Sequence, residues 1–200
     1  MVRIFFIRHG ETDWNREKRL MGWKETPLND MGRRQAESLS RELASFPISA
    51  LYSSPLKRTM ETSEIIARPH GLDVIKEEGF IEVAFGPWEG RPFKELIATK
   101  EYKQFRQFPK DFFHPEIERI VDVQKRAVDA LDKIVKDCGE GIITVVSHCD
   151  VIRAVLAYYL KMDLNAFRKL IIDNASLSVL DFDVDKICLS LLNHRGKLEV

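Results

Sequence analysis

Two short apolar runs, each ending next to a histidine, constrain the fold of this chain more than any other feature. Residues 2–7 lead into Arg8 and His9, and residues 142–147 lead into His148. Runs of this length that are apolar on both faces are typical of central strands in a parallel sheet. The carboxyl ends of such strands meet at one sheet edge, where ligands of open α/β sheets bind. We therefore expect the two histidines to lie close together.

The rest of the chain continues this alternation of strands and helices. The further expected strands are 49–53, 73–76, 177–182 and 187–192, and the expected helices are 32–46, 56–68, 117–134 and 151–160. The pattern predicts an α/β fold, a three-layer α/β/α sandwich with a mainly parallel central sheet. Because 200 residues suit one domain, we expect a single domain over 1–200. The Phe- and Pro-rich stretch at about 83–116 is expected to be a helical insertion that covers the active site.

The overall charge gives no reason to expect a nucleic-acid or membrane partner. Lys plus Arg and Asp plus Glu both number 31, so the formal net charge is zero. No apolar run approaches the roughly 20 residues of a membrane-spanning helix. The three cysteines have no paired spacing, which suits a reducing compartment. We expect a cytoplasmic protein.

Other charged side chains follow the predicted strands at the same sheet edge. Arg58 falls in the first turn of the helix after strand 49–53, and Glu82 follows the third strand. Together with Arg8, these residues suit phosphate chemistry. Arginine forks match phosphate oxygens, a neutral imidazole can attack phosphorus, and a protonated carboxyl can supply a proton to a leaving alkoxide.

Several segments also resemble the signature of the histidine phosphatase superfamily, which has the phosphoglycerate-mutase-like fold. The segments that carry the resemblance, in chain order, are Arg8-His9-Gly10-Glu11-Thr12 with Trp14-Asn15, residues 52–59 (YSSPLKRT), Glu82 with residues 85–90 (FGPWEG), Ser147-His148 and Asp173-Asn174-Ala175-Ser176. They span nearly the whole chain except residues 91–116.

The resemblance implies a role for each matching residue. His9 is the nucleophile that becomes phosphohistidine. Arg8, Arg58 and His148 hold the phosphoryl oxygens, and Asn15 donates a further hydrogen bond to them. Glu82 protonates the leaving oxygen and then activates water. The resemblance implies no metal and no other cofactor.

Three functions fit these residues, and a phosphatase fits best. A cofactor-dependent phosphoglycerate mutase is the alternative, but mutases carry Arg-His-Tyr-Gly where this chain has residues 83–86 (VAFG), and a second arginine where it has Gln107. A non-catalytic phosphate-binding protein is the third, and nothing motivates it because every expected catalytic residue is present.

The expected substrate is a small phosphomonoester, whose identity the sequence leaves open. Residues 85–89 and 192–195 resemble α-ribazole phosphatases, whereas residues 173–176 resemble metal-independent phosphoserine phosphatases. Self-association as a homodimer also stays open.

Overall fold

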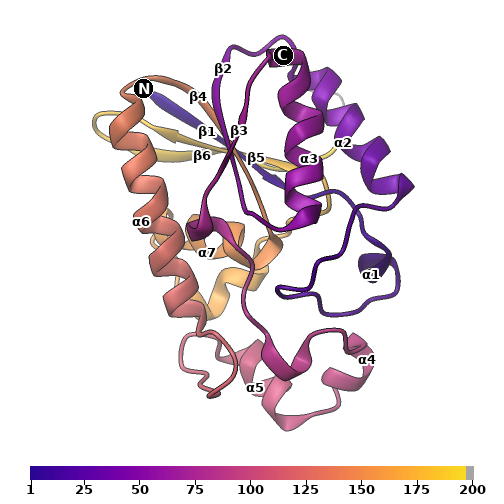
Figure 1. Cartoon of the computed structure of the whole chain (residues 1–200). Coiled ribbons are helices and arrows are strands. Elements are labelled where there is room, and N and C mark those ends of the chain that lie inside the picture. Colours follow the sequence, from indigo (N-terminus) through magenta and orange to yellow (C-terminus); the bar gives the residue numbers. More distant parts are fainter. Residues whose placement is uncertain (197–200) are drawn as a thin grey trace.

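A six-stranded sheet forms the centre of the molecule in the computed structural model, which describes residues 1–196 (Figure 1). The strands are β1 (Val2–Arg8), β2 (Ile48–Ser53), β3 (Val74–Lys76), β4 (Gly141–Ser147), β5 (Leu177–Phe182) and β6 (Ile187–His194). They lie in the order β3-β2-β4-β1-β5-β6. The first four strands pair in parallel, while β5 is antiparallel to both β1 and β6. The predicted mainly parallel sheet is confirmed.

Helices cover both faces of the sheet. The α-helices are α1 (Asp13–Arg16), α2 (Asp30–Leu43), α3 (Lys57–Ala67), α4 (Phe93–Leu96), α5 (Lys100–Gln107), α6 (Ile120–Cys138) and α7 (Cys149–Tyr159). The 3-10 helices are η1 (Arg68–His70), η2 (Glu78–Phe80), η3 (Gly86–Trp88) and η4 (Leu164–Lys169). In Figure 1, α2 and α3 lie on one side of the sheet and α6 and α7 on the other.

The alternation of side chains along β1 explains the two helical layers. Ile4 and Phe6 belong to the core under α6 and α7, whereas Phe5 and Ile7 belong to the core under α2 and α3. Successive side chains of a strand point to opposite faces, so a run that is apolar at every position needs cover on both. The predicted three-layer sandwich is confirmed.

Several predicted helix boundaries were wrong by two to four residues, as in α6, which was expected at 117–134 and spans Ile120–Cys138, and at one of them the reason is local. The helix expected to reach residue 46 ends at Leu43. Phe46 precedes Pro47, and the proline ring disfavours helical backbone at the residue before it. Phe46 still packs edge-on against Phe5, with 5.5 Å between the ring centres.

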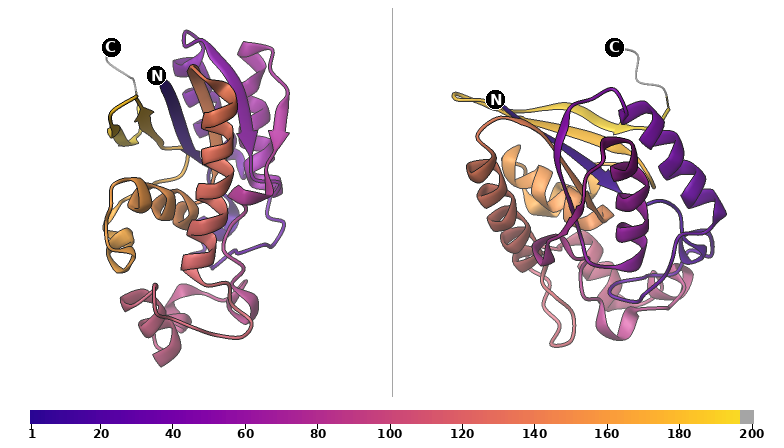
Figure 2. Two further views of the ribbon diagram at one scale, coloured as in Figure 1. Left: turned by 90° about the vertical axis from the view of Figure 1, so that its left-hand side faces the viewer. Right: turned by 45° about the horizontal axis from the view of Figure 1, so that its top comes forward.

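The segment that contains α4 and α5 lies at the end of the molecule opposite to the N-terminus, as both views of Figure 2 show. Because the parallel strands begin near the N-terminus, their carboxyl ends point toward this α4–α5 segment. The aromatic side chains that form its core are Phe85, Trp88, Tyr102, Phe105 and Phe112. Within residues 1–196, no helix has both the length and the apolar character needed to cross a membrane.

Candidate active site

His9 lies directly after β1, and the pairing of β1 with β4 brings it next to His148. Arg8 is in register with Ser147, and the centres of the two imidazole rings are 5.4 Å apart. His9 Nδ1 lies 2.7 Å from the Gly10 carbonyl oxygen, so it carries the proton and leaves the lone pair on Nε2. Burial, reinforced by the charges of Arg58 and Arg8, holds the pKa of His9 well below its ordinary value.

Two arginines lie near the histidines, Arg8 at the end of β1 and Arg58 in the first turn of α3. Arg58 is fully buried, and its Nη atoms donate to the carbonyls of Lys24 at 3.0 Å and Gly22 at 2.7 Å. Arg8 Nη1 donates to the Ile172 carbonyl at 2.7 Å. Burial lowers the pKa of Arg58 to about 10, which still leaves it charged at neutral pH.

Three buried nitrogen atoms around His9 have no hydrogen-bond partner within the described residues. They are Arg8 Nε, Arg58 Nε and His148 Nδ1. The other ring nitrogen of His148 lies 2.8 Å from Ser54 Oγ. Since buried polar atoms are nearly always paired, three unpaired ones beside each other indicate the place of an anionic ligand.

Glu82 lies close to His148, one of the residues with an unpaired nitrogen. Its Oε2 is 3.9 Å from His148 Nδ1, and its Oε1 accepts from the Val83 amide at 3.0 Å. Burial, with the negative charge of Asp150 adding to it, raises the pKa of Glu82 to about 7 against the opposing charge of Arg58. A carboxyl with this pKa can both give and take a proton near neutral pH.

Asn15 is oriented by a network that the sequence did not reveal. Its Oδ1 accepts from the Thr12 amide at 3.0 Å and from Asn174 Nδ2 at 3.2 Å. Asn174 Nδ2 also lies 3.1 Å from the carbonyl oxygen of His9. Because Oδ1 is occupied, the amide NH2 of Asn15 is left to donate into the cavity that this residue lines.

Arg8, Asn15 and Glu82 open into one cavity of about 280 Å³, whereas His9, Arg58 and His148 are buried and are not among the residues that line it. The residues that line it are Arg8, Asn15, Arg19, Leu20, Met21, Gly22, Glu82, Phe85, Phe93, Tyr102, Phe105, Arg106, Cys149, Asp150, Arg153 and Arg168. Its volume lies at the lower limit for ligand pockets, which suits a small metabolite. Across residues 1–196, no three His, Cys, Asp or Glu side chains are grouped to hold a metal ion.

The sequence profile of the histidine phosphatase superfamily (branch 1) matches residues 4–195. The chain belongs to this superfamily. The resemblance predicted from its motifs is therefore confirmed, and so is the phosphoglycerate-mutase-like fold.

Named members of the histidine phosphatase superfamily match over most of the chain. Phosphoserine phosphatase 1 of Hydrogenobacter thermophilus is 33% identical over 206 residues, which cover 100% of this chain and 97% of the relative. A probable phosphoglycerate mutase GpmB of Yersinia enterocolitica is 32% identical over 184 residues, covering 91% and 86%. The solved structure of Bacillus stearothermophilus YhfR superimposes with a TM-score of 0.92 at 28% identity and covers 98% of both chains.

In this superfamily member the loop around Gly22 is hydrogen-bonded both to Arg58 and to the backbone at Glu82. Gly22 has a φ of +55°, and a Cβ there would lie 2.1 Å from Glu89 Oε1, so only glycine fits. That carboxylate oxygen accepts from the amides of Trp23 and Phe85. The Trp23 indole donates to the Glu82 carbonyl at 2.6 Å. Sequence reasoning missed Trp23, for which no motif gave a signal.

Proposed function

We propose that the protein is a metal-independent phosphatase that hydrolyses a small phosphomonoester through a phosphohistidine formed on His9. The observation that supports this most directly is the set of buried, unpaired nitrogens on Arg8, Arg58 and His148, three residues close to a neutral His9. The two arginines offer the positive charge that a transferring phosphoryl group requires.

In the first step, the Nε2 lone pair of His9 attacks phosphorus while the bond from phosphorus to the alcohol oxygen breaks. The phosphoryl oxygens take hydrogen bonds from Arg8, Arg58 and the amide of Asn15. Ser54 Oγ lies 2.8 Å from Nε2 of His148, and with Ser54 as the donor in this proposal the proton of His148 is on Nδ1, where it can bind another phosphoryl oxygen. The departing alkoxide takes the proton of Glu82, whose raised pKa keeps that proton in place near neutral pH.

In the second step, a water molecule attacks phosphorus from the side that the alcohol has left. Glu82, now a carboxylate, accepts a proton from this water. The phosphorus–nitrogen bond breaks and its electron pair returns to Nε2 of His9. Inorganic phosphate leaves, and both Glu82 and His9 are restored.

A phosphoglycerate mutase is the alternative, since one relative at 32% identity bears that name. A mutase would return the phosphoryl group to the substrate rather than to water. Phe85, which lines the cavity, has no hydroxyl for a substrate carboxylate, and this supports hydrolysis. The relative at 33% identity is named a phosphoserine phosphatase, which makes phosphoserine the first substrate to test.

The test is turnover without metal. Purified protein is treated with excess chelator and assayed on a panel of phosphomonoesters, with 3-phosphoglycerate included for mutase activity. We expect phosphate release that the chelator does not change, and a trapped label on His9 that is labile in acid and stable in alkali. Label on a serine or aspartate, or activity that requires added magnesium, would contradict the proposal. 2-Phosphoglycerate formed faster than phosphate would establish the mutase.

A further inference from the structure

Residues 173–176, just before β5, are tied by their backbone to the segment that carries the proposed nucleophile. The Ala175 amide lies 3.1 Å from the Arg8 carbonyl oxygen and 3.2 Å from that of His9, and the Arg8 amide donates to the Ser176 carbonyl at 3.2 Å. Ala175 has a φ of +51°, in the left-handed region that residues other than glycine seldom occupy. Such a conformation persists only where the surrounding contacts hold it, so this turn is fixed against the end of β1.

Asn174, within this turn, has a side-chain amide of fixed direction. Its Nδ2 lies 3.1 Å from the carbonyl oxygen of His9 and 3.4 Å from that of Gly10. Carbonyl oxygens only accept hydrogen bonds, so the atom that faces both of them has to be the NH2 nitrogen. The reversed amide would place its oxygen against two other oxygens.

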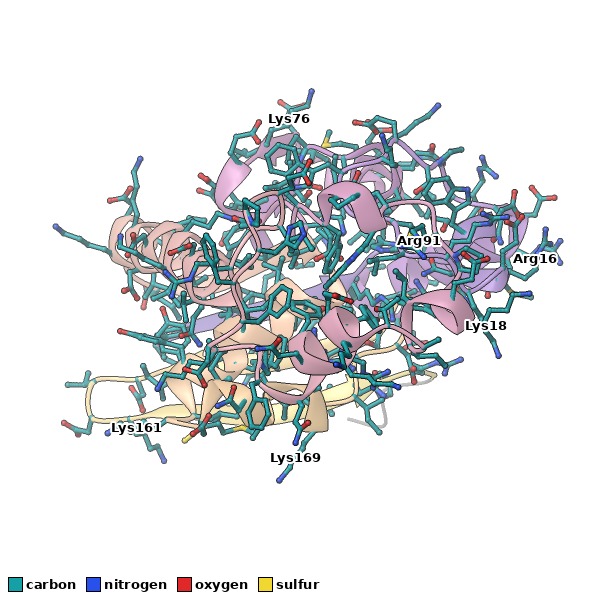
Figure 3. All side chains as sticks on the ribbon, turned by 90° about the horizontal axis from the view of Figure 1, so that it is seen from below. Arg16, Lys18, Lys76, Arg91, Lys161 and Lys169 are labelled. Carbon is teal, nitrogen blue, oxygen red and sulfur yellow. The ribbon has the colours of Figure 1, made fainter. Side chains whose placement is uncertain are left out.

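The amide of Asn174 determines in turn which way Asn15 faces. Because Asn174 presents a donor, the Asn15 atom 3.2 Å from it is the oxygen Oδ1, and the Thr12 amide donates to the same oxygen at 3.0 Å. The NH2 group of Asn15 is left for the cavity that this residue lines. Figure 3 shows the nearby Arg16 and Lys18 projecting outward from the molecule. The inward-facing donor on this stretch of chain is therefore the one that Asn174 orients.

Asp173 anchors the same turn to the end of β6. Its backbone amide donates to Asn193 Oδ1 at 2.7 Å, and its Oδ2 accepts from Asn193 Nδ2 and from Arg195 Nη1, both at 3.1 Å. The hydrogen bond from Asn193, with Arg195 adding to it, holds the pKa of Asp173 below its ordinary value. The carboxylate is charged at neutral pH and keeps both donors, so Asn174 projects from a turn that is held on both sides.

We propose, building on the phosphatase function proposed above, that Asn174 is a positioning residue for the phosphoryl transfer. It sets the amide of Asn15 with the NH2 group toward the phosphoryl group, and it holds the backbone carbonyl of His9. Asn174 is not among the described residues that line the cavity, so it acts through these two residues. A donor that is held in place beforehand needs no reorganisation when the anion binds, whereas a rotating amide would also present its oxygen to it.

Two substitutions test the orientation of Asn15, with binding of inorganic phosphate measured by calorimetry. Asn174→Asp keeps the shape of the side chain, but its carboxylate attracts the NH2 group of Asn15 and turns Oδ1 toward the phosphate. Asn174→Ala leaves Asn15 held by Thr12 alone. We expect phosphate to bind about 100-fold and about tenfold more weakly, the two ends of the range for hydrogen bonds to a charged group. Unchanged binding in both variants would overturn the proposal.

The matched controls are Asn165→Asp and Asn165→Ala. Asn165 lies in η4, and its side-chain oxygen accepts from the Lys110 amide. The same changes of charge and size are thereby made away from Asn15, and phosphate binding should stay within about twofold of the wild type, as for sites that share no partners. A loss as large as in the Asn174 variants would show that the effect is not specific to Asn174 and would overturn the proposal.

A double-mutant cycle with Asn15→Ala separates positioning from general damage to the structure. If Asn174 acts on phosphate binding through Asn15, then Asn174→Ala should weaken binding by less than about twofold once the Asn15 amide is gone. Equal losses in both backgrounds would show that Asn174 supports the structure alone. Should Asn174→Ala protein fail to fold, Asn174→Asp takes its place, and its loss should be smaller without the Asn15 amide than with it.

The turnover number kcat reports the second contact of Asn174. In the Asn15→Ala background, Asn174→Ala should still lower kcat by about tenfold, because a less firmly held His9 attacks from a poorer position. An unchanged kcat there would refute the hold on His9.

Binding and turnover distinguish this proposal from the proposed function. Coupled losses of phosphate binding, without phosphate release by the wild type, would refute the phosphatase and keep the orientation of Asn15. Phosphate release by the wild type with additive losses of binding would refute the orientation of Asn15 and keep the phosphatase.

Discussion

The phosphate end of the cavity is built on the sheet, whereas its far end is built on α5 and η4. His9 and His148 follow two paired strands, β1 and β4, whose register sets the distance between them. Tyr102 and Arg168 are instead held by aromatic packing around Phe105. The sheet thus positions the groups proposed for chemistry, and the added helices form the other end of the cavity. Substitutions at the two ends should differ in kind as well as in size.

The largest effect is expected at the phosphate end, from His9→Ala. Loss of the nucleophile should lower kcat by about 10⁴-fold or more, since residues that act as a unit in covalent catalysis carry effects of this order. The fold should remain, because His9 belongs to neither of the two apolar cores. Steady-state kinetics and circular dichroism measure the two results. Retained turnover would place the nucleophile elsewhere.

Glu82→Gln should have the next largest effect, and its size should depend on the leaving group. We expect a loss of about 10²- to 10⁴-fold for alkyl phosphates, the contribution of general acid catalysis. p-Nitrophenyl phosphate should lose much less, because nitrophenolate departs without a proton. Glu78→Gln, at an exposed site four residues earlier, is the control. Equal losses for both kinds of substrate would argue against proton donation.

The sequence predicted the phosphate end better than the far end for a physical reason. His9, His148, Arg58 and Glu82 each follow a strand, and parallel strands bring their carboxyl ends together whatever the helices do. Each of these four was expected in the site, and the structure brings them together.

Arg168 and Asp150 gave no such signal. They lie 18 residues apart, in a 3-10 helix and at the start of α7, and they meet only because η4 packs on α7. Asn174 was only partly predictable. Its motif, residues 173–176, was recognised in the sequence, but its hydrogen bonds to His9 and Asn15 depend on the path of the chain after β1.

The pH dependence of kcat/KM should report Glu82 and His9 separately. The raised pKa of Glu82, about 7, means that the acid is protonated below this pH and lost above it. Activity should therefore fall about tenfold per pH unit above about 7, as expected for one required proton. The lowered pKa of His9 places its protonation, and the loss of activity that follows, well below pH 6.5. In Glu82→Gln protein the fall at high pH should disappear. If it persists, another group is the acid.

The smallest effect is expected at Arg126 of α6, which binds the backbone next to Glu82. Arg126 pairs with Glu118 at 2.8 Å and donates to the carbonyls of Gly79 at 2.7 Å and Glu82 at 3.2 Å. Glu118 in turn accepts from the Ala84 amide. The pair therefore holds the backbone on both sides of Glu82 without touching the phosphate end.

Arg126→Gln should lower kcat for alkyl phosphates by about tenfold, with a smaller loss for p-nitrophenyl phosphate, because a displaced Glu82 donates its proton less well. It should also lower the free energy of unfolding by about 1–3 kcal/mol, since buried carbonyls lose a charged donor. Lys125→Gln breaks the neighbouring pair with Asp129, whose side chains are 75% and 62% exposed, and should change neither quantity measurably. A loss of stability with the same fall in kcat for both kinds of substrate would show that Arg126 supports the fold alone. A loss confined to alkyl phosphates would show that α6 sets the position of the acid.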